Sequence, residues 1–172
     1  MLLLGGCVLG VGCGGTSGSA PPTTTFRVPF SSMEPTLNCA KPAFGCLGTA
    51  DDHVLVQPGK PVKRADIVAF RAPFEAEARC GIAGVFIKRV IGLPGETWSE
   101  RNGYVYINGK KLNEPYVKAD RRDTETHGAE KIPKGTYFLM GDSRAMSCDS
   151  RVWGPLPQRN IVGPVVKIIH MH

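Results

Sequence analysis

The sequence predicts an all-β protein, mainly antiparallel, and two observations point to this class. Gly (21) and Pro (14) together supply about a fifth of the 172 residues, which favours short strands and many turns over long helices. Several short segments are rich in β-branched and aromatic residues, whereas helical periodicity is weak and confined to residues 74–79. The length fits one domain, and a hydrophobic content of 42% excludes wholesale disorder.

The segments that read as strands are His53–Gln57, Ile67–Phe70, Val85–Ile91, Tyr104–Ile107, Thr136–Met140 and Ile161–Ile169. The Asn108-Gly109 pair predicts a tight hairpin turn, and a Gly/Pro-rich turn is expected at 92–95. We expect a folded domain at 27–172 with a small β-hairpin insertion at roughly 99–134. The polar stretch 117–131 reads as an exposed loop or as part of that insertion, and one short helical turn is expected near Asn160.

Residues 1–26 carry no charged side chain and read as a short export or anchor segment followed by a tether. The apolar part has the length of an export signal but lacks a basic start, so either the true start lies upstream or the signal is unusual. Cys7 and Cys13 each follow small residues, as at a bacterial lipoprotein processing site. A truncated membrane anchor explains the segment equally well. No apolar run reaches the length of a transmembrane helix.

The remaining cysteines are candidates for disulfides: Cys39, Cys46, Cys80 and Cys148. They show no C-x-x-C spacing and do not pair with the four histidines, which argues against zinc. An even number behind an export segment favours disulfides outside the cytoplasm over buried thiols. Pairing Cys39 with Cys46 and Cys80 with Cys148 is one of three connectivities.

The net charge of +6 is dispersed. No basic stripe with interleaved aromatics is present, so nucleic acid is not expected as a partner. A preference for anionic lipid surfaces is compatible with the charge, but a solvated basic surface explains it more simply.

The first stretch with candidate chemistry is residues 29–37, where Ser32 precedes Glu34-Pro35. Pro35 disfavours a helical Glu34 and so predicts a bend. A Ser on such a bend can present its hydroxyl, and its own backbone N–H can face an oxyanion. By composition alone, ordinary turn chemistry is the better explanation.

The second stretch is the strand 85–91. Alternation places Phe86, Lys88 and Val90 on one face, so Lys88 is flanked by apolar side chains. If that face is buried, the pKa of Lys88 falls, and a neutral lysine is a competent base for a serine hydroxyl. The simpler alternative is a lysine whose stem lies along a half-exposed strand.

The third stretch, 141–154, is a Gly-led loop of short polar residues and arginines. Asp149 with Arg151, or Asp142 with Arg144, could form an ion pair that fixes the loop, and Ser147 could bond another functional group. An ordinary surface loop fits the composition as well. No motif places a histidine near a candidate nucleophile, and a Ser–Lys pair is the variant that needs none.

Taken together and in this order, the three stretches resemble the sequence boxes of the type I signal peptidase family, over roughly residues 27–168. The matching motifs are Ser32-Met33-x-Pro35-Thr36, then Ile87-Lys88-Arg89-Val90-Ile91-Gly92-Leu93-Pro94-Gly95-Glu96, then Gly141-Asp142-Ser143-Arg144 with Ser147, Asp149, Ser150, Arg151 and Trp153-Gly154. Three boxes at compatible spacing are a specific signal.

The resemblance implies a role for each matching residue. Ser32 would be the nucleophile and Lys88 its general base, with Ser147 orienting the lysine amine. Asp149 and Arg151 would hold the scaffold as an ion pair, and Asp142 would shape the same loop. If Ser147 contacts Lys88, then Cys80 and Cys148 lie near each other, which supports their pairing.

The resemblance further implies a coiled antiparallel β core and a serine endopeptidase that works without cofactor or metal. Its partners would be the signal peptides of exported preproteins, cut after small residues at −1 and −3, and a membrane surface. The protein would be a monomer at the extracytoplasmic face of a bacterial membrane.

Phe30 and Ser143 differ from the residues that are common in the family at their positions. Phe30 stands where many members carry a small or hydroxyl residue, which in some donates to the oxyanion. Loss of one such donor costs on the order of 10²–10³ in rate. Phe30 and Met33 are expected in the substrate groove or in a membrane-facing apolar rim. Ser143 replaces a commoner Asn, with little effect expected.

Two further readings compete with general signal peptide processing. One is a relative dedicated to a single substrate, such as a conjugation or pilin precursor. The other is an inactive β-domain that binds signal-like peptides, for which Phe30 argues. The intact set of Ser32, Lys88 and Ser147 argues against a pure binder.

Overall fold

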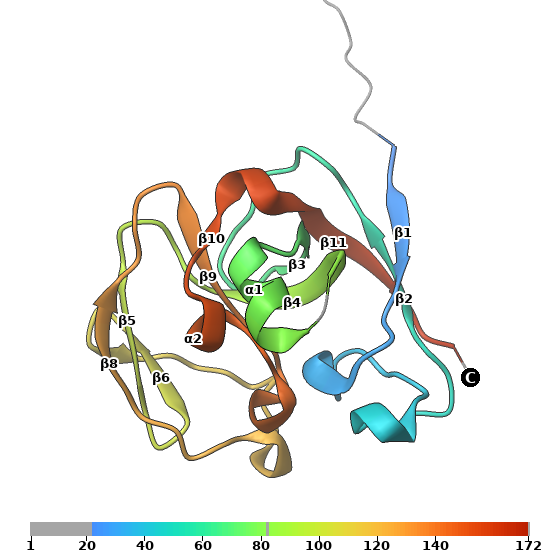
Figure 1. Ribbon diagram of the computed structural model, residues 1–172, viewed down its shortest axis with the longest axis horizontal. Coiled ribbons are helices and arrows are strands. Elements are labelled where there is room, and N and C mark those ends of the chain that lie inside the picture. Colours follow the sequence, from blue (N-terminus) through green and yellow to red (C-terminus); the bar gives the residue numbers. More distant parts are fainter. Residues whose placement is uncertain (1–21, 82, 172) are drawn as a thin grey trace, which may run out of the picture.

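The computed structural model describes residues 22–81 and 83–171, and it confirms the predicted mainly antiparallel β fold (Figure 1). A seven-stranded sheet has the order β1 (Thr24–Arg27), β2 (His53–Val56), β11 (Ile161–Ile169), β3 (Ile67–Arg71), β4 (Val85–Gly92), β9 (Thr136–Met140) and β10 (Leu156–Pro157). A four-stranded sheet has the order β7 (Lys110–Lys111), β6 (Tyr104–Ile107), β5 (Thr97–Arg101) and β8 (His127–Lys131). Every strand pair recorded in the described residues is antiparallel.

Helical elements are short. The α-helices are α1 (Phe74–Cys80) and α2 (Ser150–Trp153), and the 3₁₀ turns are η1 (Ser31–Met33), η2 (Pro42–Phe44), η3 (Ala119–Arg121), η4 (Arg144–Met146) and η5 (Gln158–Asn160). Helix α1 confirms the weak periodicity seen at 74–79, and η5 lies where a helical turn was expected. Arg79 of α1 donates to the carbonyl of Val152 in α2 at 2.7 Å, so the two helices lie side by side.

Tight hairpins build the smaller sheet. Asn108 (φ 50°) and Gly109 (φ 75°) are both left-handed and join β6 to β7, as the sequence predicts. Asn102 and Gly103 have the same backbone signature and join β5 to β6. The smaller sheet thus occupies much of the expected insertion at 99–134, although its first strand begins earlier, at Thr97.

The larger sheet curls around its own core, helped by register shifts in β4 and β11. One buried cluster lies among β1, β2, β3 and β11 and includes Met33 and Leu37. A second lies beneath α1 and α2, and a third joins the two sheets around Trp98 and Phe138. The third cluster fixes the small sheet against β4 and β9.

Two segments differ from the sequence expectation. Thr24 and Thr25, assigned to the tether, pair with β2 as part of β1. Strand β8 falls in the stretch that was expected to be a loop or part of the insertion, and its pairing with β5 makes it part of the sheet. The candidate lipidation residues Cys7 and Cys13 lie outside the described residues. Within the described residues, no helix is both long enough and apolar enough to span a membrane.

Candidate active site

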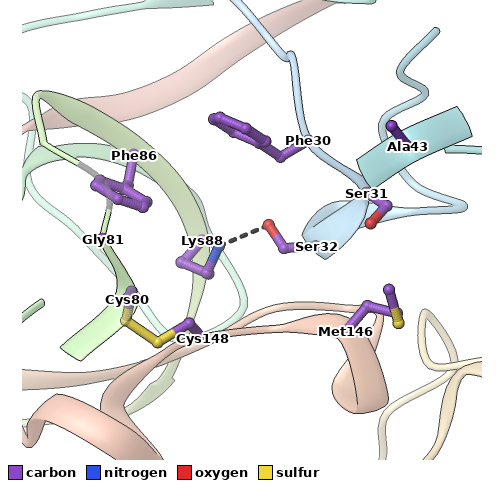
Figure 2. Close-up of a pocket in the computed structure, with 10 residues that line it drawn as sticks. All are labelled: Phe30, Ser31, Ser32, Ala43, Cys80, Gly81, Phe86, Lys88, Met146 and Cys148. Atoms are coloured by element: carbon purple, nitrogen blue, oxygen red, sulfur yellow. Dashed lines mark hydrogen bonds between the residues drawn. A yellow bond between two sulfur atoms is a disulfide. The ribbon is translucent and has the colours of Figure 1, made fainter. Parts of the chain in front are cut away.

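Ser32 sits at the centre of η1, a three-residue turn held between two extended residues. Phe30 before it has φ −134° and ψ 148°, and Glu34 after it has φ −68° and ψ 145°. The extended Glu34 confirms the bend that Pro35 predicts. The turn leaves the Ser32 side chain half-buried at the edge of a pocket (Figure 2).

Lys88 comes from β4, which pairs with β3 on one side and β9 on the other. Its side chain is only 3% exposed, and Nζ donates a hydrogen bond of 2.6 Å to Ser32 Oγ. Burial lowers the pKa of Lys88 to about 8, although the carboxylates of Asp149 and Asp142 act in the opposite direction. Strand alternation predicted a lowered pKa if this face is buried. The face is buried, and the pKa of Lys88 is lowered.

Asp142 ties the third box to β4. The buried carboxylate accepts hydrogen bonds from Arg89 Nε (2.8 Å) and Nη2 (2.6 Å) and from Thr36 Oγ1 (2.5 Å). The proposed Asp142–Arg144 pair is wrong, because the Arg144 guanidinium instead pairs with buried Glu114. Sequence reasoning missed the part played by Arg89, and its only signal was a charged residue inside an apolar strand.

Asp149 and Arg151 form the ion pair that the sequence suggested. Asp149 caps α2 and accepts from Arg151 Nε and Nη2, each at 2.9 Å. It also accepts the backbone N–H of Gly141 at 3.1 Å. Burial alone would raise the pKa of Asp149, but the Arg151 guanidinium holds it below its ordinary value. This carboxylate therefore remains charged and fixes the loop.

Ser147 lies close to Ser32, but the expected bond to the Lys88 amine is not formed. Its Oγ is buried and neither donates nor accepts a hydrogen bond within the described part of the chain. A Cβ on Gly141 would overlap both Ser147 Oγ and the carbonyl oxygen of Ser32. The missing side chain of Gly141 thus lets the loop approach the nucleophile turn. The orienting role of Ser147 stays a prediction.

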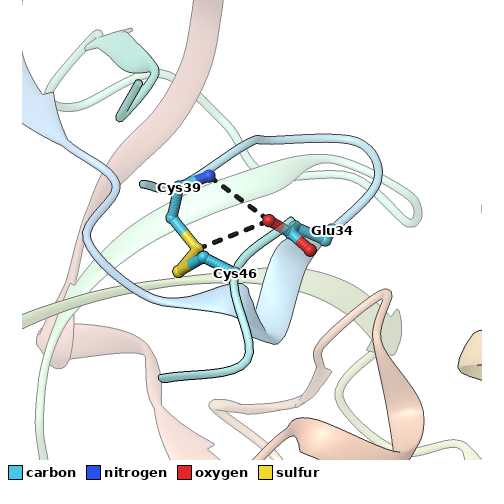
Figure 3. A group of neighbouring side chains, drawn as sticks. All are labelled: Glu34, Cys39 and Cys46. Atoms are coloured by element: carbon cyan, nitrogen blue, oxygen red, sulfur yellow. Dashed lines mark hydrogen bonds between the residues drawn. A yellow bond between two sulfur atoms is a disulfide. The ribbon is translucent and has the colours of Figure 1, made fainter. Parts of the chain in front are cut away.

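Glu34 is a supporting residue that the sequence reasoning overlooked. It is 1% exposed, and its Oε1 accepts the backbone N–H groups of Leu47 (2.9 Å) and Cys39 (3.4 Å). Figure 3 shows this carboxylate against the Cys39–Cys46 disulfide. Its other oxygen pairs with Arg121 of η3 at 3.2 Å. Glu34 thereby joins the nucleophile turn to the disulfide loop and to η3.

The pocket beside Ser32 and Lys88 has a volume of about 520 Å³ and is mostly apolar (Figure 2). Its remaining lining residues are Phe30, Ser31, Ala43, Cys80, Gly81, Phe86, Met146 and Cys148. The Cys80–Cys148 disulfide forms part of the wall, so the structure contains the pairing that the resemblance supported. A pocket of this kind suits small or apolar side chains next to the Ser32 hydroxyl.

Phe30 and Met33 have different surroundings. Phe30 is half-buried and lines the pocket, as expected for a groove residue. Met33 is 1% exposed because η1 turns it into the core, so the suggestion that it belongs to a membrane-facing rim is wrong. It does line a small cavity of about 30 Å³ behind Phe30.

Comparison with known proteins agrees with this geometry. The family described as "Signal peptidase, peptidase S26" matches residues 19–170. The chain is 40% identical over 118 residues to Signal peptidase I V of Bacillus subtilis, covering 62% of this chain and 66% of that protein. It is 37% identical over 145 residues to Signal peptidase I of Leptolyngbya laminosa, covering 81% of this chain and 64% of that protein. The chain thus spans slightly less than two thirds of the length of these curated relatives.

A solved structure of a signal peptidase I from Enterococcus faecalis is also similar. The TM-score is 0.51 at 31% sequence identity, and the match covers 63% of this chain and 98% of that one. The family match spans most of the chain and includes both Ser32 and Lys88. The chain therefore belongs to the signal peptidase family, peptidase S26.

Proposed function

We propose that the protein is a serine endopeptidase that removes signal peptides from exported preproteins. The observation that carries the proposal is the 2.6 Å approach of Lys88 Nζ to Ser32 Oγ beside an open apolar pocket. A buried lysine with a pKa of about 8 exists partly as the free amine near neutral pH, as a general base requires.

The reaction follows from these two groups. The neutral Lys88 amine takes the proton of Ser32 as Oγ attacks the carbonyl carbon of the −1 residue. The backbone N–H of Ser32 faces the developing oxyanion. Lys88 then gives its proton to the departing amine, which leaves an ester on Ser32. The Lys88 amine, now neutral again, activates a water molecule that hydrolyses the ester.

The pocket supports a substrate with small residues near the cut. Two bulky aromatic rings, Phe30 and Phe86, line it, and a disulfide bounds one side. Small side chains at −1 and −3 would fit this space with their backbone next to Ser32. Asp142, Asp149 and Arg151 act in the proposal as positioning residues: Asp142 bonds Arg89 of β4, and the Asp149–Arg151 pair fixes the loop. Ser147 would orient the lysine amine.

We further propose that the protein works as a monomer at a membrane surface, on the extracytoplasmic side. Two disulfides are typical of oxidising compartments. Large apolar side chains stand exposed at Phe74 (78%), Leu47 (75%) and Met146 (52%). Met146 lines the active-site pocket, so contact with lipid there would bring the membrane close to the dyad.

The test is cleavage of a preprotein with an Ala-x-Ala site in detergent, with product masses measured. The protein should cut after the −1 Ala, and Ser32→Ala and Lys88→Ala should abolish the product. Lys167→Ala, at an exposed position on β11, is the matched control and should retain the activity. Cleavage that persists in Ser32→Ala would refute the proposed nucleophile.

Phe30→Ser belongs in the same experiment. A serine here restores a hydroxyl beside the oxyanion, so the rate should rise, by up to the 10²–10³ that one such donor contributes. No cleavage by any version, including Phe30→Ser, would contradict the general peptidase and favour a dedicated substrate or a peptide-binding domain.

A further inference from the structure

Three side chains that could hold a metal ion meet at the edge of the smaller sheet. Glu100 belongs to β5, His127 begins β8, and Glu125 lies just before β8. His127 Nε2 is 3.0 Å from Glu125 Oε2 and 3.8 Å from Glu100 Oε2. One ligand atom from each residue lies within 4.8 Å of the other two. The Trp98 ring packs on the His127 ring with centroids 5.5 Å apart, which helps to fix the imidazole.

Glu100 is an unusual residue in this cluster. Its side chain is fully buried, yet neither carboxylate oxygen accepts a hydrogen bond from any residue that the structure describes. A buried carboxylate without hydrogen bonds is costly unless another group compensates its charge. The cluster therefore contains a buried carboxylate oxygen without a hydrogen bond, and this oxygen lies near two further atoms that could bind a metal ion.

Arg151 also contacts the cluster, but several other carboxyl groups share its charge. Its Nη1 lies 3.8 Å from both Glu100 Oε2 and Glu125 Oε2. The same guanidinium bonds Asp123 (2.5 Å) and Asp149 (2.9 Å). Four carboxyl groups thus share one guanidinium, and a divalent cation bound here would offset the negative charge among them.

We propose that Glu100, Glu125 and His127 bind a zinc ion. One imidazole nitrogen and two carboxylate oxygens form a ligand set that zinc accepts, with water completing four-coordination. Calcium and magnesium prefer more oxygen ligands and no imidazole. Glu125 is 58% exposed on its side chain, which leaves a path for the ion to enter.

Cysteine spacing and the absence of cysteine–histidine pairs in the sequence exclude zinc sites built on thiolates, but not one built on carboxylates and an imidazole. The other three-residue cluster, Glu34 with Cys39 and Cys46, lacks thiolates because its cysteines form a disulfide.

The zinc would act on structure rather than on the reacting bond. It would join β5 to β8 and to the chain around Glu125. It would also take two glutamates away from Arg151, which would then serve Asp149 and Asp123 alone. Because Asp149 fixes the loop that carries Ser147, the ion would stabilise this loop indirectly, through Arg151 and Asp149. The inference does not depend on the proposed peptidase activity.

The test is zinc titration of the full protein after chelator treatment, by calorimetry and by the visible absorption of a cobalt(II) substitute. We expect one ion per chain. Glu100→Gln and His127→Gln should each weaken binding by more than the roughly 10–100-fold that loss of an outer-shell partner costs. At a hundredfold excess over its dissociation constant, zinc should raise the melting temperature by roughly 5–10 °C.

Two variants keep the result interpretable. Glu125→Gln changes an exposed side chain and should fold normally while weakening zinc binding. His170→Gln is the matched control, because His170 also contacts a carboxylate, that of Asp52 at 2.9 Å, but lies outside the cluster. The proposal would be overturned if the parent protein binds no zinc, or if Glu100→Gln binds zinc as tightly as the parent. It would also be overturned if binding is lost in His170→Gln but kept in the three cluster variants.

Discussion

Replacing Lys88 with methionine should abolish activity and yet stabilise the fold near neutral pH. Burial lowers the Lys88 pKa from 10.5 to about 8, which corresponds to about 3 kcal/mol against the charged form. Methionine fills a similar volume and carries no charge. It loses the hydrogen bond to Ser32, worth about 1 kcal/mol. The net gain of about 2 kcal/mol at pH 7 should raise the melting temperature by roughly 4–8 °C.

The gain should depend on pH in a defined direction. Between pH 8 and 10.5 the unfolded chain keeps the Lys88 proton that the folded protein has lost, so the stability of the parent rises with pH across this window. The difference between Lys88→Met and the parent should therefore shrink from pH 8 to pH 10.5. Thermal melts of both proteins at several pH values measure it, with Lys167→Met as an exposed control that should stay within about 0.5 kcal/mol. The reasoning would be refuted if Lys88→Met is less stable than the parent at pH 7, or if the difference in stability between the two proteins does not change with pH.

Three other outcomes are expected. The kcat/KM for preprotein cleavage should rise about tenfold from pH 7 to 9, as the Lys88 amine loses its proton near pH 8; a flat profile would contradict a lysine base. Gly141→Ala should lower kcat by more than about tenfold, because its methyl group would overlap the nucleophile turn, whereas Gly128→Ala, which faces open space, should not; peptide cleavage rates compare them. Removing Cys80 and Cys148 together should cost about 4 kcal/mol in denaturant unfolding, since their disulfide closes a 68-residue separation, and a loss under about 1 kcal/mol would show that the cross-link does little.

The sequence was most informative where local pattern decides the structure. The strand around Lys88 was placed with its apolar neighbours on the correct face, and Asn108-Gly109 marked its hairpin. Strand β8 was not predicted, because its residues His127–Lys131 include no β-branched or aromatic side chain and become a strand through pairing with β5.

Long-range charge pairing was the other gap. Arg89 and Asp142 lie 53 residues apart, and Arg144 and Glu114 lie 30 apart. Spacing along the chain suggested instead that neighbouring Asp142 and Arg144 would pair. Only the packing of the loop against β4 decides between these partners, and no periodicity in the sequence encodes it.

The two proposed catalytic groups stand on segments that are held in different ways. Lys88 lies in an interior strand with hydrogen-bonded neighbours on both sides, whereas Ser32 lies on a three-residue turn that the backbone N–H of Ser143 holds at 3.1 Å. The buried Met33 and Glu34 also anchor this turn, but it has no strand pairing, so we expect it to open at a lower free energy than the sheet. On heating, the hydroxyl should therefore leave the amine while the larger sheet is still intact. Inactivation would then begin as a reversible local opening, several degrees below the temperature at which the chain unfolds.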